Sequence, residues 1–204
     1  MIFVLGGQKR GNIATWNSIA ELQRLTEAKI YVSGYDYWGV MPFKYTWFDT
    51  PTEILYNIFN DENSWYKHKD KYPRYYHQWR HLSHCYNSIN PTSNEIIYKI
   101  RNDYNYSGFP LQDIEPNTIH VPDKEHHSSK LFWTDVVCND QILGMDKLTA
   151  DKYFDLPNYI PETPDKIINH LKGKIKLSDI GIESLLRDYM YHHNISLKTF
   201  FFRY

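Results

Sequence analysis

The sequence predicts a single α/β domain, in which helices flank a mostly parallel central sheet and further helices form the C-terminal segment. The main observation is the opening of the chain. An apolar run at residues 2–5 is followed by glycines, a helical pattern and a β-prone run at 29–33, an order that makes the two strands parallel neighbours. The second observation is that 42% of the 204 residues are apolar, which is enough for the core of one domain.

The first half of the chain alternates strand and helix patterns. Asn12 fits the N-cap of a helix that runs to about residue 27. Asn90 and Pro91 end a later helix, since the residue before a proline avoids helical geometry. The expected elements are strands at 2–5, 29–33 and 98–101 and helices at 12–27, 52–60 and 77–89.

The second half is richer in helical patterns. Ile182, Leu185, Leu186 and Tyr189 recur at the spacing of one helix face and predict an amphipathic helix. Three prolines between residues 156 and 164 predict a loop. The expected elements are strands at 119–122 and 197–202, a loop or short strand at 132–138, and helices at 139–154, 164–172 and 180–193.

Composition excludes several classes of function. The formal net charge is −1, so no surplus of positive charge exists for binding a nucleic-acid backbone. No apolar run reaches 18 residues, and the apolar start lacks a basic leader, so we expect neither a membrane span nor a secretory signal. Cys85 and Cys138 fit no metal-ligand spacing and are expected to be reduced thiols. These features indicate a cytoplasmic protein.

Aromatic residues make up 17% of the chain, including 18 tyrosines and 6 tryptophans. Tyrosine and tryptophan combine an apolar ring with a polar group, which suits contact with sugars. An AT-rich genome would also enrich Tyr, Phe, Ile, Asn and Lys together. Both interpretations stay open on composition alone.

Polar side chains and glycines follow three of the expected strands. In open α/β sheets, ligands bind outside the carboxyl ends of the strands, so these positions are candidates for a shared site. The glycines after the first strand do not have the spacing of a P-loop or a dinucleotide fingerprint, and a tight turn with solvated Lys9 and Arg10 is the alternative. The residues that we expect to bind a ligand are Gly6, Gly7, Gln8, Arg10, Asp36 and Arg101.

Asp103 is the carboxylate at the end of the strand expected at 98–101. A carboxylate in this position can hold Mg²⁺ or Mn²⁺, which take oxygen ligands and leave positions for phosphate oxygens. The ion would neutralise a diphosphate leaving group. The alternative is that Asp103 only forms the turn through its side chain.

Several short motifs follow one another in a fixed order: Gly7 to Arg10, Trp16 to Ser18, residues 30–33, "YKIRND" at 98–103 and "NDQ" at 139–141. Together they resemble the WavE-type and related viral and bacterial polysaccharide glycosyltransferases. The similarity covers about residues 1–155. It implies the GT-A fold, with a nucleotide-sugar-binding half at 1–105 and an acceptor half with the C-terminal helices at 106–204.

This resemblance implies a glycosyltransferase that moves a sugar from a UDP- or GDP-sugar donor to a glycan or glycoprotein acceptor, in the host cytoplasm if the protein is viral. It also implies Mn²⁺ or Mg²⁺ at an Asp-x-Asp-like site. Arg101 replaces the first Asp of that pattern here, and Asp103 is the position that matches the metal ligand. Gln8 and Arg10 would lie near the nucleotide.

Asp140 is the candidate catalytic base, because an inverting transfer needs a carboxylate that removes the proton of the acceptor hydroxyl. It lies at the start of the helix expected at 139–154, where the helix dipole stabilises the anion. An N-cap role is the equal alternative, and Asp135 is the second candidate for the base.

Two other functions compete with a transferase. A carbohydrate-binding module would use the aromatic clusters at 35–48 and 72–79, although such modules are usually all-β. A metal-dependent hydrolase would use His81, His84 and Asp103, but a fourth ligand at a suitable spacing is missing. A late histidine can complete a GT-A metal site, and His120, His127 and His193 are candidates for it.

Overall fold

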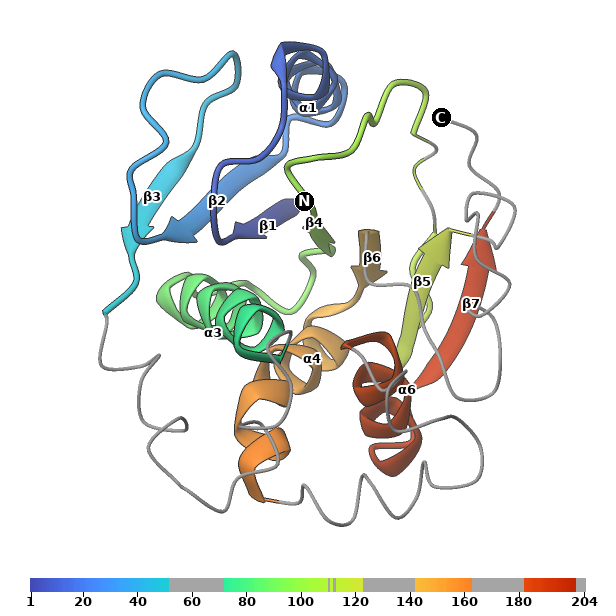
Figure 1. Cartoon of the computed structure of the whole chain (residues 1–204). Helices are drawn as coiled ribbons and strands as arrows, with labels where there is room; N and C mark the ends of the chain where they lie inside the picture. Colours follow the sequence, from blue (N-terminus) through green and yellow to red (C-terminus); the bar gives the residue numbers. More distant parts are fainter. Residues whose placement is uncertain (52–71, 110, 112, 123–141, 163–181, 201–204) are drawn as a thin grey trace.

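Residues 1–51, 72–109, 111, 113–122, 142–162 and 182–200 are described by the computed structural model (Figure 1). Their strands are β1 (Ile2–Gly6), β2 (Lys29–Gly34), β3 (Thr46–Asp49), β4 (Ile97–Ile100), β5 (Thr118–Pro122), β6 (Ile142–Met145) and β7 (Ser196–Phe200). Their helices are α1 (Ile13–Thr26), α3 (Tyr72–Ser88), α4 (Lys147–Glu162) and α6 (Ile182–His192). The α/β class predicted from the sequence is confirmed.

Strand β1 is buried on both faces of the sheet. Ile2 and Val4 pack in the core beneath α3, α4 and α6, whereas Phe3 and Leu5 pack in a second core beside α1. All four side chains are 2% exposed or less. Because side chains alternate along a strand, this continuous apolar run requires cover on both sides. Figure 1 shows that cover, with α1 on one side of the sheet and the other three helices on the opposite side.

Helix α1 begins and ends where local chemistry predicts. The Asn12 side chain is the N-cap and accepts a hydrogen bond from the Thr15 amide at 3.0 Å. Glu27 ends the helix in the left-handed conformation, with φ at 52°. The predicted Asn12 cap is therefore confirmed.

The described strands form one sheet in the order β3-β2-β1-β4-β6-β5-β7. Strands β3, β2, β1 and β4 pair in parallel, and so do β5 and β7. Strand β6 is antiparallel to both of its neighbours, β4 and β5. The sheet is therefore mixed, which corrects the prediction of a mostly parallel sheet.

Strand β6 is also the reason for the largest error in the predicted elements. A helix was expected at 139–154, but residues 142–145 form a strand and the helix α4 begins at Lys147. Asp146 caps α4, since its side chain accepts from the Thr149 amide at 2.9 Å. All four residues of β6 are buried, and a short apolar run that is buried on both faces shows no alternation that would separate it from a helix.

Smaller differences concern α4 and β3. Helix α4 continues through Pro157 and Pro161, where a loop was expected at 156–164, because Leu156 and its neighbours are buried in the helical layer. Strand β3 was not expected, and it forms by pairing with β2. The helices predicted at 52–60 and 164–172 and the segment 132–138 lie outside the described residues. Among the described helices, none combines the length and the apolar character needed to cross a membrane.

The order of the first four strands creates a topological switch point. The chain passes from β1 to β2 and β3 on one side, and returns through α3 to place β4 on the other side of β1. The connections that leave β1 and β4 therefore diverge, and a crevice forms at the carboxyl ends of these two strands.

Candidate functional site

A cavity of about 320 Å³ lies at this switch point. Its walls come from the carboxyl ends of β1 and β4, from helix α3 and from the end of β2. The lining residues are Gly6, Gly7, Gln8, Arg10, Tyr35, Gln78, His81, Leu82, Ile100, Arg101, Asn102 and Asp103. The structure thus brings together Asp103 and all of the expected ligand-binding residues except Asp36, whose side chain is exposed and lies outside the lining.

The two glycines after β1 have separate structural roles. Gly7 has φ at +88°, a conformation that other residues rarely adopt, so it makes the turn that leads into the pocket wall. Gly6 lies against α3, where an added Cβ would come within 3.0 Å of the Leu82 backbone nitrogen. Glycine at position 6 therefore lets α3 approach the strand closely, and this approach brings α3 residues into the pocket.

Asn102 fastens the two strand ends to each other. Its side-chain amide donates to the Gln8 carbonyl at 2.8 Å, and its Oδ1 accepts from the Arg10 amide at 3.0 Å. Gly11 packs so tightly against this connection that a Cβ there would come within 2.0 Å of the Asn102 carbonyl oxygen. No specific role for Asn102 was predicted from the sequence. In the structure this residue is buried, at 6% exposed.

Arg101 and Asp103 form a bidentate ion pair just after the carboxyl end of β4. Arg101 donates from Nε to Oδ1 at 2.9 Å and from Nη2 to Oδ2 at 2.7 Å. Each side chain is about a quarter exposed. Partial burial works to raise the pKa of Asp103, but the hydrogen bonds and charge of Arg101 outweigh it, with a further contribution from Arg10, and the pKa is lowered. Asp103 is therefore a carboxylate at neutral pH.

The metal expected from the sequence does not fit the described residues around Asp103. Both oxygens of this carboxylate accept hydrogen bonds from Arg101. Asp103 is the one Asp or Glu among the described residues that line the pocket. Within the described segments, no three His, Cys, Asp or Glu side chains are grouped closely enough to hold an ion. A divalent ion needs several oxygen ligands, and here one already paired carboxylate is offered.

His81 is a pocket residue that sequence reasoning considered only as a zinc ligand. It is 2% exposed, and its Nδ1 lies 2.6 Å from Oγ1 of Thr50, which lies 2.5 Å from Oγ of Ser33. The ring of Tyr35 packs edge-to-face on the His81 ring, with centroids 4.6 Å apart. A chain of buried hydrogen bonds from the ends of β2 and β3 thus orients this imidazole.

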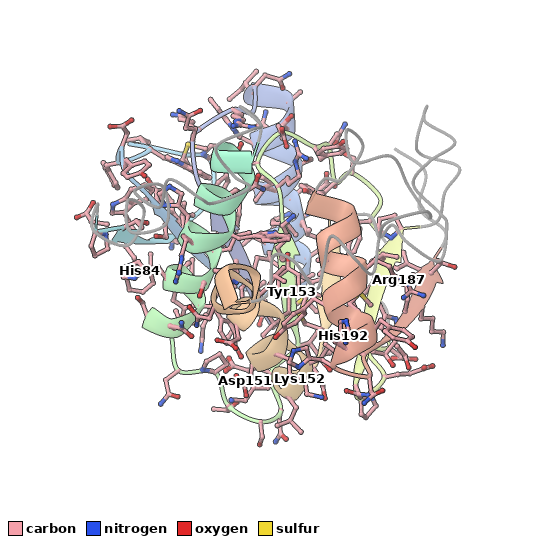
Figure 2. All side chains as sticks on the ribbon, turned by 60° about the horizontal axis from the view of Figure 1, so that its bottom comes forward. His84, Asp151, Lys152, Tyr153, Arg187 and His192 are labelled. Carbon is pink, nitrogen blue, oxygen red and sulfur yellow. The ribbon has the colours of Figure 1, made fainter. Side chains whose placement is uncertain are left out.

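The other histidine candidates that the structure describes, His84, His120 and His193, do not line the pocket. His84, on α3, has its Nε2 3.0 Å from the Asp49 carbonyl oxygen. His120 is buried in β5, where burial lowers its pKa and its Nε2 accepts from the Glu115 amide. His193 packs on the Tyr189 ring just after α6. Figure 2 shows His84 on α3 and His192 at the end of α6, well apart on the helical face of the molecule. His127, Asp135 and Asp140 lie outside the described residues.

The aromatic cluster at 35–48 belongs largely to the core. Trp38 is 3% exposed and Phe43 is 5% exposed, and both pack in the cluster beside α1. Tyr35 and Tyr37 are the exceptions, at 40% and 66% exposed, and the Tyr37 ring contacts Trp47 edge-to-face. In the second cluster, at 72–79, the one described aromatic side chain, Trp79, is 3% exposed. The buried rings therefore stabilise the fold, whereas Tyr35 also lines the cavity.

The charged residues that line the cavity favour an anionic ligand. Two arginines and one aspartate line the cavity, and its wall also includes Gln8, Gln78, Asn102 and the buried His81. Comparison of the chain with models of protein families, with curated proteins and with solved structures found no match.

Proposed function

We propose that the protein is a glycosyltransferase that binds a UDP- or GDP-sugar donor in the switch-point cavity and transfers the sugar to a glycan or glycoprotein acceptor. The observation that carries this proposal is the position and chemistry of the cavity. It lies outside the carboxyl ends of β1 and β4, where α/β sheets bind nucleotides, and two arginines from those ends line it. The motif resemblance supplies the reaction.

In this proposal the diphosphate of the donor lies between the segments that follow β1 and β4. Arg10 and Arg101 stabilise the negative charge that develops on the diphosphate as the bond from the anomeric carbon to the phosphate oxygen breaks. The acceptor hydroxyl oxygen forms the new bond to the anomeric carbon and loses its proton to a base. The nucleoside diphosphate leaves with the electron pair of the broken bond.

Asp140 stays the predicted base, but the reason for the prediction changes. The helix dipole no longer supports it, because residues 142–145 form β6 and α4 begins later. Strand β6 begins beside Ile100, the last residue of β4, and so at the pocket end of the sheet. Asp140 precedes this strand by two residues in the sequence. This order supports a contribution of that segment to the site.

The second half of the chain is proposed to bind the acceptor. Its described strands β5, β6 and β7 continue the sheet that begins in the first half, because β6 pairs directly with β4. The GT-A division into 1–105 and 106–204, cytoplasmic residence and assistance by Mn²⁺ or Mg²⁺ stay predictions.

A thermal-shift panel of nucleotide sugars tests the proposed function. A ligand that binds only the folded protein stabilises it by about 2.7 kcal/mol when its concentration is 100 times its Kd. We expect one UDP- or GDP-sugar to raise the melting temperature and the matching nucleoside without phosphates to leave it unchanged. The same donor should be hydrolysed slowly without acceptor. A protein that neither binds nor hydrolyses any nucleotide sugar is not this transferase.

A further inference from the structure

The pairing of Arg101 with Asp103 bears on how the site balances the charge of its ligand. We propose that guanidinium groups balance the diphosphate charge in this pocket and that Asp103 positions Arg101 instead of holding a metal ion. This inference rests on the proposed function, because it concerns the diphosphate of the same donor. It replaces the metal that the resemblance implies with side chains that are present in the cavity.

The geometry of Asp103 favours a positioning role. Its two oxygens accept from two different nitrogens of Arg101, at 2.9 and 2.7 Å, which is the parallel arrangement of a strong Arg–carboxylate pair. Each carboxylate oxygen has a second lone pair, so a metal ion at Asp103 would share these oxygens with Arg101 and lie beside its guanidinium. Repulsion between the two cations opposes that arrangement.

The distribution of charged residues around the cavity favours an anion over a metal ion. Arg10 and Arg101 both line it, from opposite sides of the switch point, and Asp103 neutralises only one of them. Among the described lining residues, two arginines are therefore set against one carboxylate, and this positive balance attracts an anion and opposes a divalent cation.

Hydrogen bonds hold the backbone at both arginines in place. The Arg101 amide donates to the Tyr106 hydroxyl at 2.9 Å, and that hydroxyl donates to the Arg101 carbonyl at 2.6 Å. The Arg10 backbone is fastened by Asn102 at 3.0 Å. Backbone that is ordered before binding loses less conformational freedom when an anion arrives, and the pair with Asp103 orders the Arg101 guanidinium in the same way.

The test is calorimetric titration of UDP and GDP into the full chain, once with EDTA and once with Mn²⁺. We expect the affinity for the preferred nucleotide to change by less than about tenfold between the two buffers, which corresponds to less than ~1.4 kcal/mol. Arg101→Gln should weaken binding by about tenfold to a hundredfold, since it removes charge-assisted hydrogen bonds. Arg24→Gln, which makes the same change on the exposed surface of α1, is the matched control.

Asp103→Asn separates the two roles of the carboxylate. If Asp103 is a positioning residue, this variant should keep its nucleotide affinity in EDTA within about tenfold of the wild type. Its rate constant kcat for donor hydrolysis should fall by about tenfold with little change in KM. Asp103→Glu should restore part of kcat. Asp113→Asn, on the exposed surface, controls for the loss of one negative charge. A melting curve of each variant shows that the protein is folded.

Two results overturn the inference in distinguishable ways. If Mn²⁺ strengthens nucleotide binding by more than about tenfold, the diphosphate depends on a metal, and loss of that gain in Asp103→Asn would identify Asp103 as its ligand. If the folded wild-type protein binds neither UDP nor GDP in either buffer, the proposed function itself fails, and the inference fails with it.

Discussion

The strands on the two sides of the β4–β6 boundary differ in direction and in what they bring to the cavity. Strands β3, β2, β1 and β4 are parallel, and the ends of β1, β2 and β4 reach the cavity together. Strand β6 is antiparallel to β4, so it begins where β4 ends. The parallel half therefore supplies the described pocket residues, and the boundary with the mixed half brings the start of a strand to the same edge.

This difference teaches how a binding site is divided along one chain. Parallel neighbours concentrate polar strand ends at one edge of the sheet, and in this protein those ends carry the two arginines. Because β6 is antiparallel to β4, a part of the chain that is distant in sequence reaches that edge without another crossover helix. The predictions below test whether the two halves also differ in stability and in binding.

The largest expected effect comes from the core of the parallel half. Phe3 in β1 is fully buried, and Phe3→Ala should lower the free energy of unfolding by about 3–5 kcal/mol, because it removes contacts and leaves a cavity. Met145→Ala in β6 is the matched change in the mixed half. Urea denaturation followed by circular dichroism should show one shared transition for each variant. Two separate transitions would mean that the halves unfold independently.

Two glycine substitutions should separate an effect on nucleotide binding from an effect on stability. Gly11→Ala places a Cβ against the Asn102 carbonyl and should cost about 2–3 kcal/mol while abolishing nucleotide binding, because the strand ends must separate. Gly144→Ala, in β6 of the mixed half, places a Cβ 2.5 Å from the ring of Tyr98 in β4 and should destabilise the protein without loss of binding. Thermal melting and nucleotide titration measure the two effects. Equal loss of binding in both variants would show that the pocket depends on the whole sheet.

Asn102→Ala tests the connection between the ends of β1 and β4 more gently. It removes two hydrogen bonds between side chain and backbone, so we expect a cost of about 1–2 kcal/mol and a clear loss of nucleotide affinity. Asn158→Ala, an exposed change on α4, should affect neither property appreciably. Unchanged affinity in Asn102→Ala would contradict the view that this side chain orders the pocket.

The smallest effect is a dependence of stability on pH. The pKa of Asp103 is lowered in the folded state, so its ion pair stabilises the fold fully above the ordinary aspartate pKa of about 3.9. The contribution is lost as the pH falls from there through the lowered pKa, since the unfolded chain binds the proton more readily. Melting temperatures between pH 7 and pH 2 should fall less steeply in Asp103→Asn than in the wild type. An equal fall of the melting temperature in both proteins would show that the ion pair of Asp103 does not contribute to the pH dependence of stability.

Much of the candidate site could be predicted because it follows a local rule. Gly6, Gly7, Gln8, Arg10, Arg101 and Asp103 all come directly after strands that their apolar runs reveal, and the ends of parallel strands meet. Asp36 satisfied the same rule after β2, but its side chain is exposed outside the cavity. The rule identifies an edge of the sheet and does not determine which side chains turn inward.

The remaining pocket residues come from α3, and no spacing in the sequence marks them. His81 and Gln78 reach the cavity because α3 crosses beside β1, where Gly6 leaves room for its backbone. The partner that orients His81 is Thr50, which is 31 positions away along the chain. Such a hydrogen bond has no local signature, since it depends on how the helix packs on the sheet.

The sequence alone determined the α/β class, the opening β-α-β unit with its Asn12 cap, and the strand ends that carry the charges. These features depend on periodicity, capping and turn chemistry, which act over a few residues. Only the tertiary structure decided that residues 142–145 pair with β4 as an antiparallel strand, that α3 contributes His81, and that Arg101 occupies both oxygens of Asp103. Those outcomes depend on strand pairing, helix packing and the direction of side chains, which are settled by contacts between residues brought together only when the chain folds.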